Sequence, residues 1–102
     1  MDKEHSNSID TKLVIGPMVY DLVSSCKLKD GENDLRGMIN HDNLSIYIEE
    51  QMDPQAQKVT ILHEVIHAIC HQAGLEPSEE LITALAYGIY GFVTTNRGVF
   101  NA

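Results

Sequence analysis

The first half of the chain carries short apolar runs, rich in β-branched residues, that are separated by polar and turn-forming residues. This spacing is typical of β-strands. Four such runs lie at residues 13–15, 19–23, 35–39 and 44–49. The polar residues 29–34 predict a turn, and residues 40–43 predict the turn of a hairpin between the last two strands. Residues 1–9 are expected to form a flexible tail ahead of the domain.

The second half has hydrophobic residues at every third or fourth position, which is the spacing of an amphipathic helix. Asp53 and Pro54 form a helix start, and Gly74 ends the first helix. Ser78 starts a second helix, which is expected to end near residues 96–98. The expected buried stripes are Val59, Leu62, Ile66, Ile69 and Ala73 on the first helix and Ile82, Leu85, Ile89 and Val93 on the second. The pattern therefore predicts an α+β fold, with a small, mostly antiparallel sheet packed on two helices.

Composition narrows the class of protein. A length of 102 residues favours a single domain, expected over residues 10–102. The 15 acidic and 7 basic residues give a formal net charge of −8, which argues against binding to nucleic acid or to an anionic membrane surface. The chain has neither the roughly 20 apolar residues of a membrane span nor an apolar signal segment. With Cys26 and Cys70 interpreted as free thiols, a cytoplasmic location is expected.

Two histidines and a glutamate form the pattern His-Glu-x-x-His at residues 63–67, inside the first predicted helix. His63 and His67 lie one helical turn apart on the same face, so both imidazoles can reach a single Zn²⁺ ion. Glu64 is placed to accept a proton from a water that the metal activates. Counted around the helix, both histidines border the apolar stripe, whereas Glu64 is expected to point to a cleft or to water.

A catalytic zinc site needs a third protein ligand and an open position. The candidates are His71, Glu79 and Glu80. His71 is rotated away from His63 and from the core, and is interpreted as a surface residue. Glu79 lies near the edge of the second apolar stripe and Glu80 at its back, so Glu79 is favoured if the two stripes face each other. Cys70 is interpreted as a small core residue.

Residues 57–69 and 78–86 resemble the small phage and prophage zincins, which are related to the ImmA/IrrE group of metallo-endopeptidases. The resemblance extends over about residues 10–96. It implies a minimal zincin-like domain with a zinc cofactor and a protein or peptide substrate. Zincins with a glutamate ligand carry it near the start of the helix after the motif, and Glu79 matches that position. Thr83 stands where many relatives have an acidic residue that orients a ligand histidine.

The functional hypothesis is a zinc-dependent metallopeptidase, encoded by a phage or another mobile element, that hydrolyses peptide bonds with a metal-activated water. Glu64 is the expected catalytic base, and His63, His67 and Glu79 are the expected metal ligands. Strand 44–49 is expected to offer an edge for pairing with an extended substrate. The candidates for stabilising the oxyanion are Arg36, Tyr47, His71, Tyr87 and Tyr90. The alternative hypothesis is a zinc-stabilised module that binds or regulates another protein without cleaving it.

Overall fold

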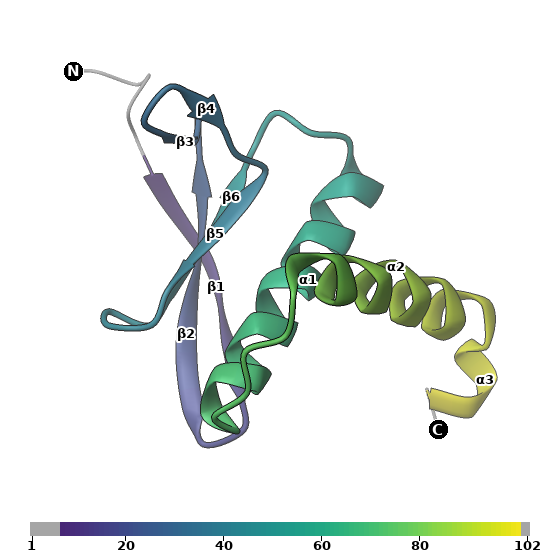
Figure 1. The fold of residues 1–102 in the computed structure, drawn as a ribbon. Coiled ribbons are helices and arrows are strands. Elements are labelled where there is room, and N and C mark those ends of the chain that lie inside the picture. Colours follow the sequence, from purple (N-terminus) through teal and green to yellow (C-terminus); the bar gives the residue numbers. More distant parts are fainter. Residues whose placement is uncertain (1–6, 101–102) are drawn as a thin grey trace.

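A computed structural model describes residues 7–100, so the tail expected at residues 1–9 lies mostly outside the described part of the chain. Within this part, six strands precede three helices (Figure 1). The strands are β1 (Asn7–Ile15), β2 (Met18–Ser25), β3 (Lys29–Asp30), β4 (Asn33–Asp34), β5 (Gly37–Asn40) and β6 (Ser45–Glu49). The helices are α1 (Pro54–Gln72), α2 (Glu79–Thr95) and α3 (Arg97–Phe100). The predicted α+β class is confirmed.

Four of the strands form one mixed sheet in the order β1-β2-β6-β5. β1 and β2 pair antiparallel around a tight turn in which Gly16 adopts a φ of +57°. β5 and β6 pair antiparallel, which confirms the hairpin predicted across residues 40–43, and the middle pair, β2 and β6, is parallel. Residues 29–34, predicted as a turn, hold the small β3–β4 hairpin. In this arrangement β6 lies inside the sheet, and β5 forms one of its edges.

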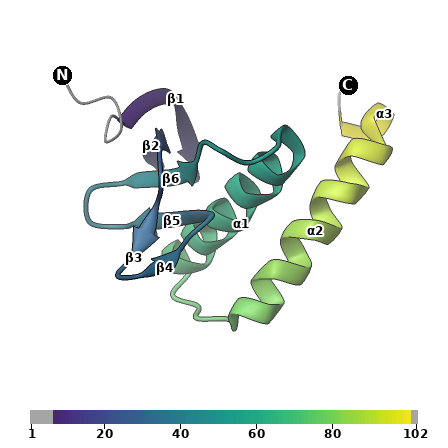
Figure 2. The same ribbon diagram turned by 90° about the horizontal axis from the view of Figure 1, so that it is seen from above.

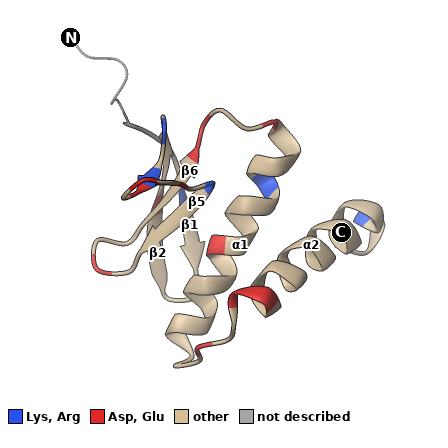
Figure 3. Ribbon diagram, turned by 45° about the horizontal axis from the view of Figure 1, so that its top comes forward, with Lys and Arg blue, Asp and Glu red and all other residues tan. Residues whose placement is uncertain are grey.

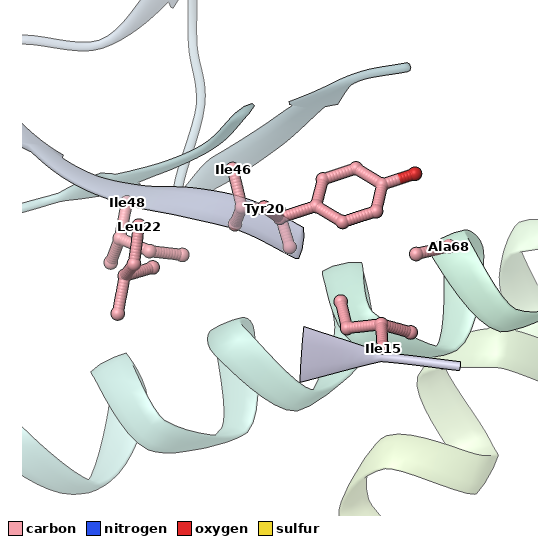
Figure 4. Packing of buried hydrophobic residues seen from close by; sticks show 6 residues of the cluster. All are labelled: Ile15, Tyr20, Leu22, Ile46, Ile48 and Ala68. Atoms are coloured by element: carbon pink, nitrogen blue, oxygen red, sulfur yellow. The ribbon is translucent and has the colours of Figure 1, made fainter. Parts of the chain in front are cut away.

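The main core lies between the sheet and α1, which crosses one face of the sheet (Figures 1 and 2). Alternate residues of β2 and β6 point to this side because side chains alternate along a strand. The buried cluster consists of Ile15, Tyr20, Leu22, Ile46, Ile48 and Ala68 (Figure 4). Each large buried side chain of this kind contributes about 1.5–3 kcal/mol. The core therefore holds α1, the helix that carries the two histidines, firmly against the sheet.

A second, smaller cluster joins α1 to α2 on the side of α1 away from the sheet (Figure 2). Its buried members are Ile66, Ile82 and Ala86. Because α1 is covered on two sides, its buried positions do not follow the single predicted stripe. Ala68, outside that stripe, is fully buried against the sheet, whereas Ile69, inside it, is 51% exposed. The predictions for Ile69 and for Ala73, which is also exposed, are therefore wrong.

The stripe predicted on α2 is buried only near its start. Ile82 is fully buried against α1, but the later members of the stripe keep 37–41% of their surface exposed; they are Leu85, Ile89 and Val93. The reason is that α2 rests on α1 through its first half, while its second half extends beyond α1 (Figure 1). Ala86 takes the second buried position instead.

Both predicted helix starts are capped as expected. The Asp53 carboxylate accepts a hydrogen bond from the Ala56 N–H at 2.8 Å, and the Ser78 hydroxyl accepts one from the Leu81 N–H at 3.1 Å. None of the described helices is both long and apolar enough to cross a membrane.

Candidate metal centre

Three side chains from the two long helices converge at one point. His63 and His67 project from one face of α1, and Glu79 is the first residue of α2. The Glu79 carboxylate bridges the two rings, with Oε1 3.0 Å from Nε2 of His63 and Oε2 2.8 Å from Nε2 of His67. The potential ligand atoms of the three residues all lie within 4.8 Å of one another. The structure thus brings together the three residues that the sequence analysis names as metal ligands.

The connection between the helices explains why Glu79 reaches the histidines. Gly74 adopts a φ of +74°, a left-handed conformation that ends α1 and turns the chain back. Ser78 then caps α2. Ile82, which follows Glu79 by three residues, is fully buried against α1 and sets the register of the two helices. The position of Glu79 therefore follows from the cap and the apolar contact.

The chemistry of the donor set fits a zinc ion. In a tetrahedral site with bonds of about 2.0–2.1 Å, neighbouring ligand atoms lie about 3.3 Å apart. The two nitrogen–oxygen distances, 3.0 and 2.8 Å, run to different oxygens of Glu79, and all potential ligand atoms lie within 4.8 Å of one another, close enough for small shifts to place them around one ion. Two imidazoles and one carboxylate are also the protein ligands of catalytic zinc sites that keep a position open. The exposure of Glu79, whose side chain is 70% accessible, leaves an ion a path to the site.

Glu64 lies in the wall of the same cleft but is almost fully covered, with only 6% of its surface exposed. Glu64 was expected to point either to a cleft or to water. It lines the cleft, but it is buried rather than exposed to water. Burial, together with the negative charge of Glu79, raises the pKa of Glu64 to about 7. A carboxyl group with a pKa near neutrality can both accept and release a proton.

Gly37 at the start of β5 is a site residue that the sequence analysis missed. A Cβ atom at this position would lie 2.6 Å from Cγ2 of Thr60 and 3.3 Å from Oε2 of Glu64. Only glycine lets β5 come this close to α1 and cover the Glu64 carboxylate. A glycine inside a strand often marks a place where another segment approaches the backbone closely. The glycine within the predicted strand 35–39 was therefore the signal that could have identified this position.

The cleft in front of these residues has a volume of about 530 Å³ and lies between β5, α1 and α2. Its strand wall is β5, because β6 lies inside the sheet. The expectation that residues 44–49 offer an edge to a substrate is therefore wrong, and β5 takes that place. Among the candidates for stabilising an oxyanion, Arg36 and Tyr87 line the cleft, whereas Tyr47, Tyr90 and His71 do not.

The other candidate ligands lie away from the centre. Glu80 is exposed and is not part of the ligand cluster found among the described residues. His71 is exposed, as expected, and its ring stacks on that of His41 with 3.8 Å between centroids. Burial and the imidazoles of His71 and His67 lower the pKa of His41. Cys70 packs against the cluster between the helices, in agreement with its interpretation as a core residue.

Thr83 lines the cleft one turn after Glu79. None of the hydrogen bonds found within residues 7–100 joins its hydroxyl to His63 or His67. At this position His63 and His67 therefore lack the acidic partner that raises imidazole basicity in many zinc sites.

A helix with the His-Glu-x-x-His pattern packed on a small sheet, with a carboxylate supplied by the next helix, defines a metallopeptidase-like domain. The chain belongs to the Peptidase_M78 family, described as the IrrE N-terminal-like domain, which matches residues 22–89. The match runs from β2 into α2 and includes every residue of the candidate centre, and it confirms the resemblance to the ImmA/IrrE group. Searches of curated proteins and of solved structures give no significant match.

Proposed function

We propose that the protein is a zinc-dependent peptidase that hydrolyses peptide bonds of a protein or peptide substrate. The observation that carries the proposal is the Glu79 carboxylate, which lies 3.0 and 2.8 Å from the two imidazole nitrogens of His63 and His67. The nearly buried carboxyl of Glu64 lines the same cleft. Membership of a peptidase family supports the assignment of the reaction class.

The roles of the residues follow from their surroundings. His63, His67 and Glu79 would hold the zinc ion, which would supply a Lewis acid for polarising a peptide carbonyl and making water more acidic. Glu64 would accept a proton from the water that adds to the carbonyl carbon. It then gives the proton to the amine nitrogen as the C–N bond breaks. Water and a peptide bond are consumed, and a carboxylate and an amine are formed.

The walls of the cleft supply substrate binding. β5 is an edge strand, so its free N–H and C=O groups can pair with an extended peptide laid along the cleft. Arg36 and Tyr87 line the same cleft, and their side chains carry donors that could serve a carbonyl oxygen that gains negative charge.

Metal content tests the proposal directly. The natively purified chain should contain about one zinc ion per molecule, measured by elemental analysis. Glu79→Gln should lose the metal, because the amide is a poor ligand. The matched control, Glu80→Gln, should retain it, because Glu80 lies outside the ligand cluster. A chain that holds no transition metal, or that holds it equally well without Glu79, would contradict the proposal.

A peptide-library digest with and without chelator tests the reaction. Zinc-dependent cleavage is the expected result. Stoichiometric zinc that raises the thermal midpoint, without cleavage of any peptide, would instead favour the non-catalytic binding module.

A further inference from the structure

One side of α2, beside its contact with α1, is apolar and exposed. Leu81 and Phe92 are 50% and 54% exposed, and Leu85 is 40% exposed. Leu81 and Leu85 are four residues apart and Phe92 follows seven residues later, which places all three on one helix face. Phe92 also makes an edge-to-face contact with Phe100 of α3, with 5.6 Å between ring centroids, and Phe100 is itself 54% exposed. Aromatic side chains are enriched in protein interfaces relative to the rest of the surface.

Two glycines lie inside α2 next to this face. A Cβ atom at Gly88 or at Gly91 would meet no other atom within 4 Å. Nothing in the described fold therefore requires glycine at these positions, although glycine weakens a helix interior relative to alanine. Small residues in the middle of an apolar helix face allow a second helix to approach closely.

The distribution of charge along α2 indicates which second helix would pack on this face. Leu81–Asn96 contains no acidic or basic residue, although the whole chain has a formal charge of −8. The charged residues that flank this stretch are Glu79 and Glu80 at one end and Arg97 at the other (Figure 3). Since Glu80 and Arg97 carry opposite signs, the face is complementary to itself when two copies run antiparallel.

A two-fold axis near Gly88 satisfies all of these features together. Gly88 is the midpoint in sequence between residues 79–80 and residue 97. An axis at Gly88 therefore places Glu80 of one copy beside Arg97 of the other. The same axis sets Phe92 of one copy against Ala84 and Leu85 of its partner. It also brings the two acidic molecules together over their longest uncharged stretch, which keeps like charges apart.

We propose that the protein forms a two-fold symmetric homodimer through antiparallel contact of the α2 helices, centred on Gly88. The cleft opens on another side of α2, towards α1 and β5, so the dimer leaves both clefts accessible. The dimer does not depend on metal binding or on cleavage.

The mass of the full chain in solution tests the dimer, measured by light scattering coupled to gel filtration and by sedimentation equilibrium over increasing concentration. The wild type should form dimers and no larger species. Phe92→Arg should be monomeric with an unchanged circular dichroism spectrum. The matched control, Val14→Arg, places the same charge at an exposed apolar residue of β1, which is 76% accessible, and should remain dimeric.

A charge exchange tests the antiparallel register. Arg97→Glu should raise the dissociation constant by about tenfold or more, because it sets a second negative charge beside Glu80 of the other copy. Adding Glu80→Arg should restore wild-type affinity. A wild type that stays monomeric at all concentrations, a dimeric Phe92→Arg variant, or a charge-exchanged variant as weak as Arg97→Glu would overturn the proposal.

Discussion

The two walls of the cleft each present one carboxylate, and the two carboxylates lie in opposite surroundings. On the wall formed by α1 and β5, Glu64 is 6% exposed and its pKa is raised to about 7. On the α2 wall, the Glu79 side chain is 70% exposed and contacts two imidazole rings. A buried carboxyl near neutrality suits proton transfer, whereas an accessible carboxylate suits a metal ligand.

The difference arises from how each wall is built. α1 is held by the main core and is covered by β5, which Gly37 allows to approach closely. α2 is attached to α1 by one small cluster, and its buried residues lie in its first half. Glu64, the proposed proton acceptor, therefore lies on the part of the molecule held by the main core, and Glu79, the proposed third ligand, lies on the part held by the smaller cluster. Substitutions in the α1–β5 wall should therefore mainly change cleavage and the pH dependence of stability, whereas substitutions that loosen α2 should also change zinc affinity.

The largest effect is expected from Glu64→Gln. The amide keeps the shape of the protonated carboxyl, so the fold and the zinc content should not change. Peptide cleavage should fall by about 10²- to 10⁴-fold, because the base is lost. Initial rates on a cleaved peptide, normalised to zinc content, measure this loss. Cleavage near the wild-type rate would show that Glu64 is not the base.

Ile82→Ala should weaken the attachment of α2. Ile82 is fully buried between the helices, so its truncation should destabilise the protein by about 2–5 kcal/mol and lower its zinc affinity, because Glu79 loses its position. Ile89→Ala is the matched control, since Ile89 is 41% exposed and should cost about 0.5 kcal/mol or less. Urea unfolding and zinc titration measure both quantities. Equal effects of the two variants would show that α2 is not held at Ile82.

Much of this arrangement could be predicted from the sequence because its signals are local. Alternation and turn residues identified the strands, and Asp53 and Ser78 identified the helix starts. Helical geometry placed His63 and His67 on one face and favoured Glu79 over Glu80 as their partner. The strands, the helix starts and the shared face of His63 and His67 need only residues close together in sequence, whereas the choice of Glu79 also required that the apolar stripes of the two helices face each other.

The errors concern contacts between distant segments. A single predicted stripe on α1 could not represent a helix covered on two sides, so Ile69 was assigned to the core. The order of strands in the sheet depends on the parallel pairing of β2 with β6, which turned the expected edge strand into an inner one. The burial of Glu64 comes from β5, which lies more than 20 residues away in sequence. Local periodicity carries no information on any of these pairings.

The pH dependence of the metal-free protein tests the burial of Glu64. Its pKa rises from 4.5 to about 7 on folding, so between these values the native state keeps a proton that the unfolded chain releases. Stability should therefore fall as the pH rises through this range, by up to about 3 kcal/mol, and level off above it. Urea unfolding in chelator at several pH values measures the fall in the wild type and in Glu64→Gln. Glu64→Gln should lack this fall in stability with pH. If the stability of both proteins changes with pH in the same way, the proposed burial of the Glu64 carboxyl group is wrong.

Gly37→Ala tests the packing that creates this burial. The added methyl would lie 2.6 Å from Cγ2 of Thr60, so β5 must move away from α1, at an expected cost of about 1–3 kcal/mol. Water would then reach Glu64, its pKa should fall towards 4.5, and the acidic limb of the cleavage profile should shift to lower pH. Thr60→Ser removes the methyl that clashes, so the double variant should recover most of the lost stability, while Thr60→Ser alone is the control. If the double variant is as unstable as Gly37→Ala, the close approach of β5 to Thr60 is not what covers the glutamate.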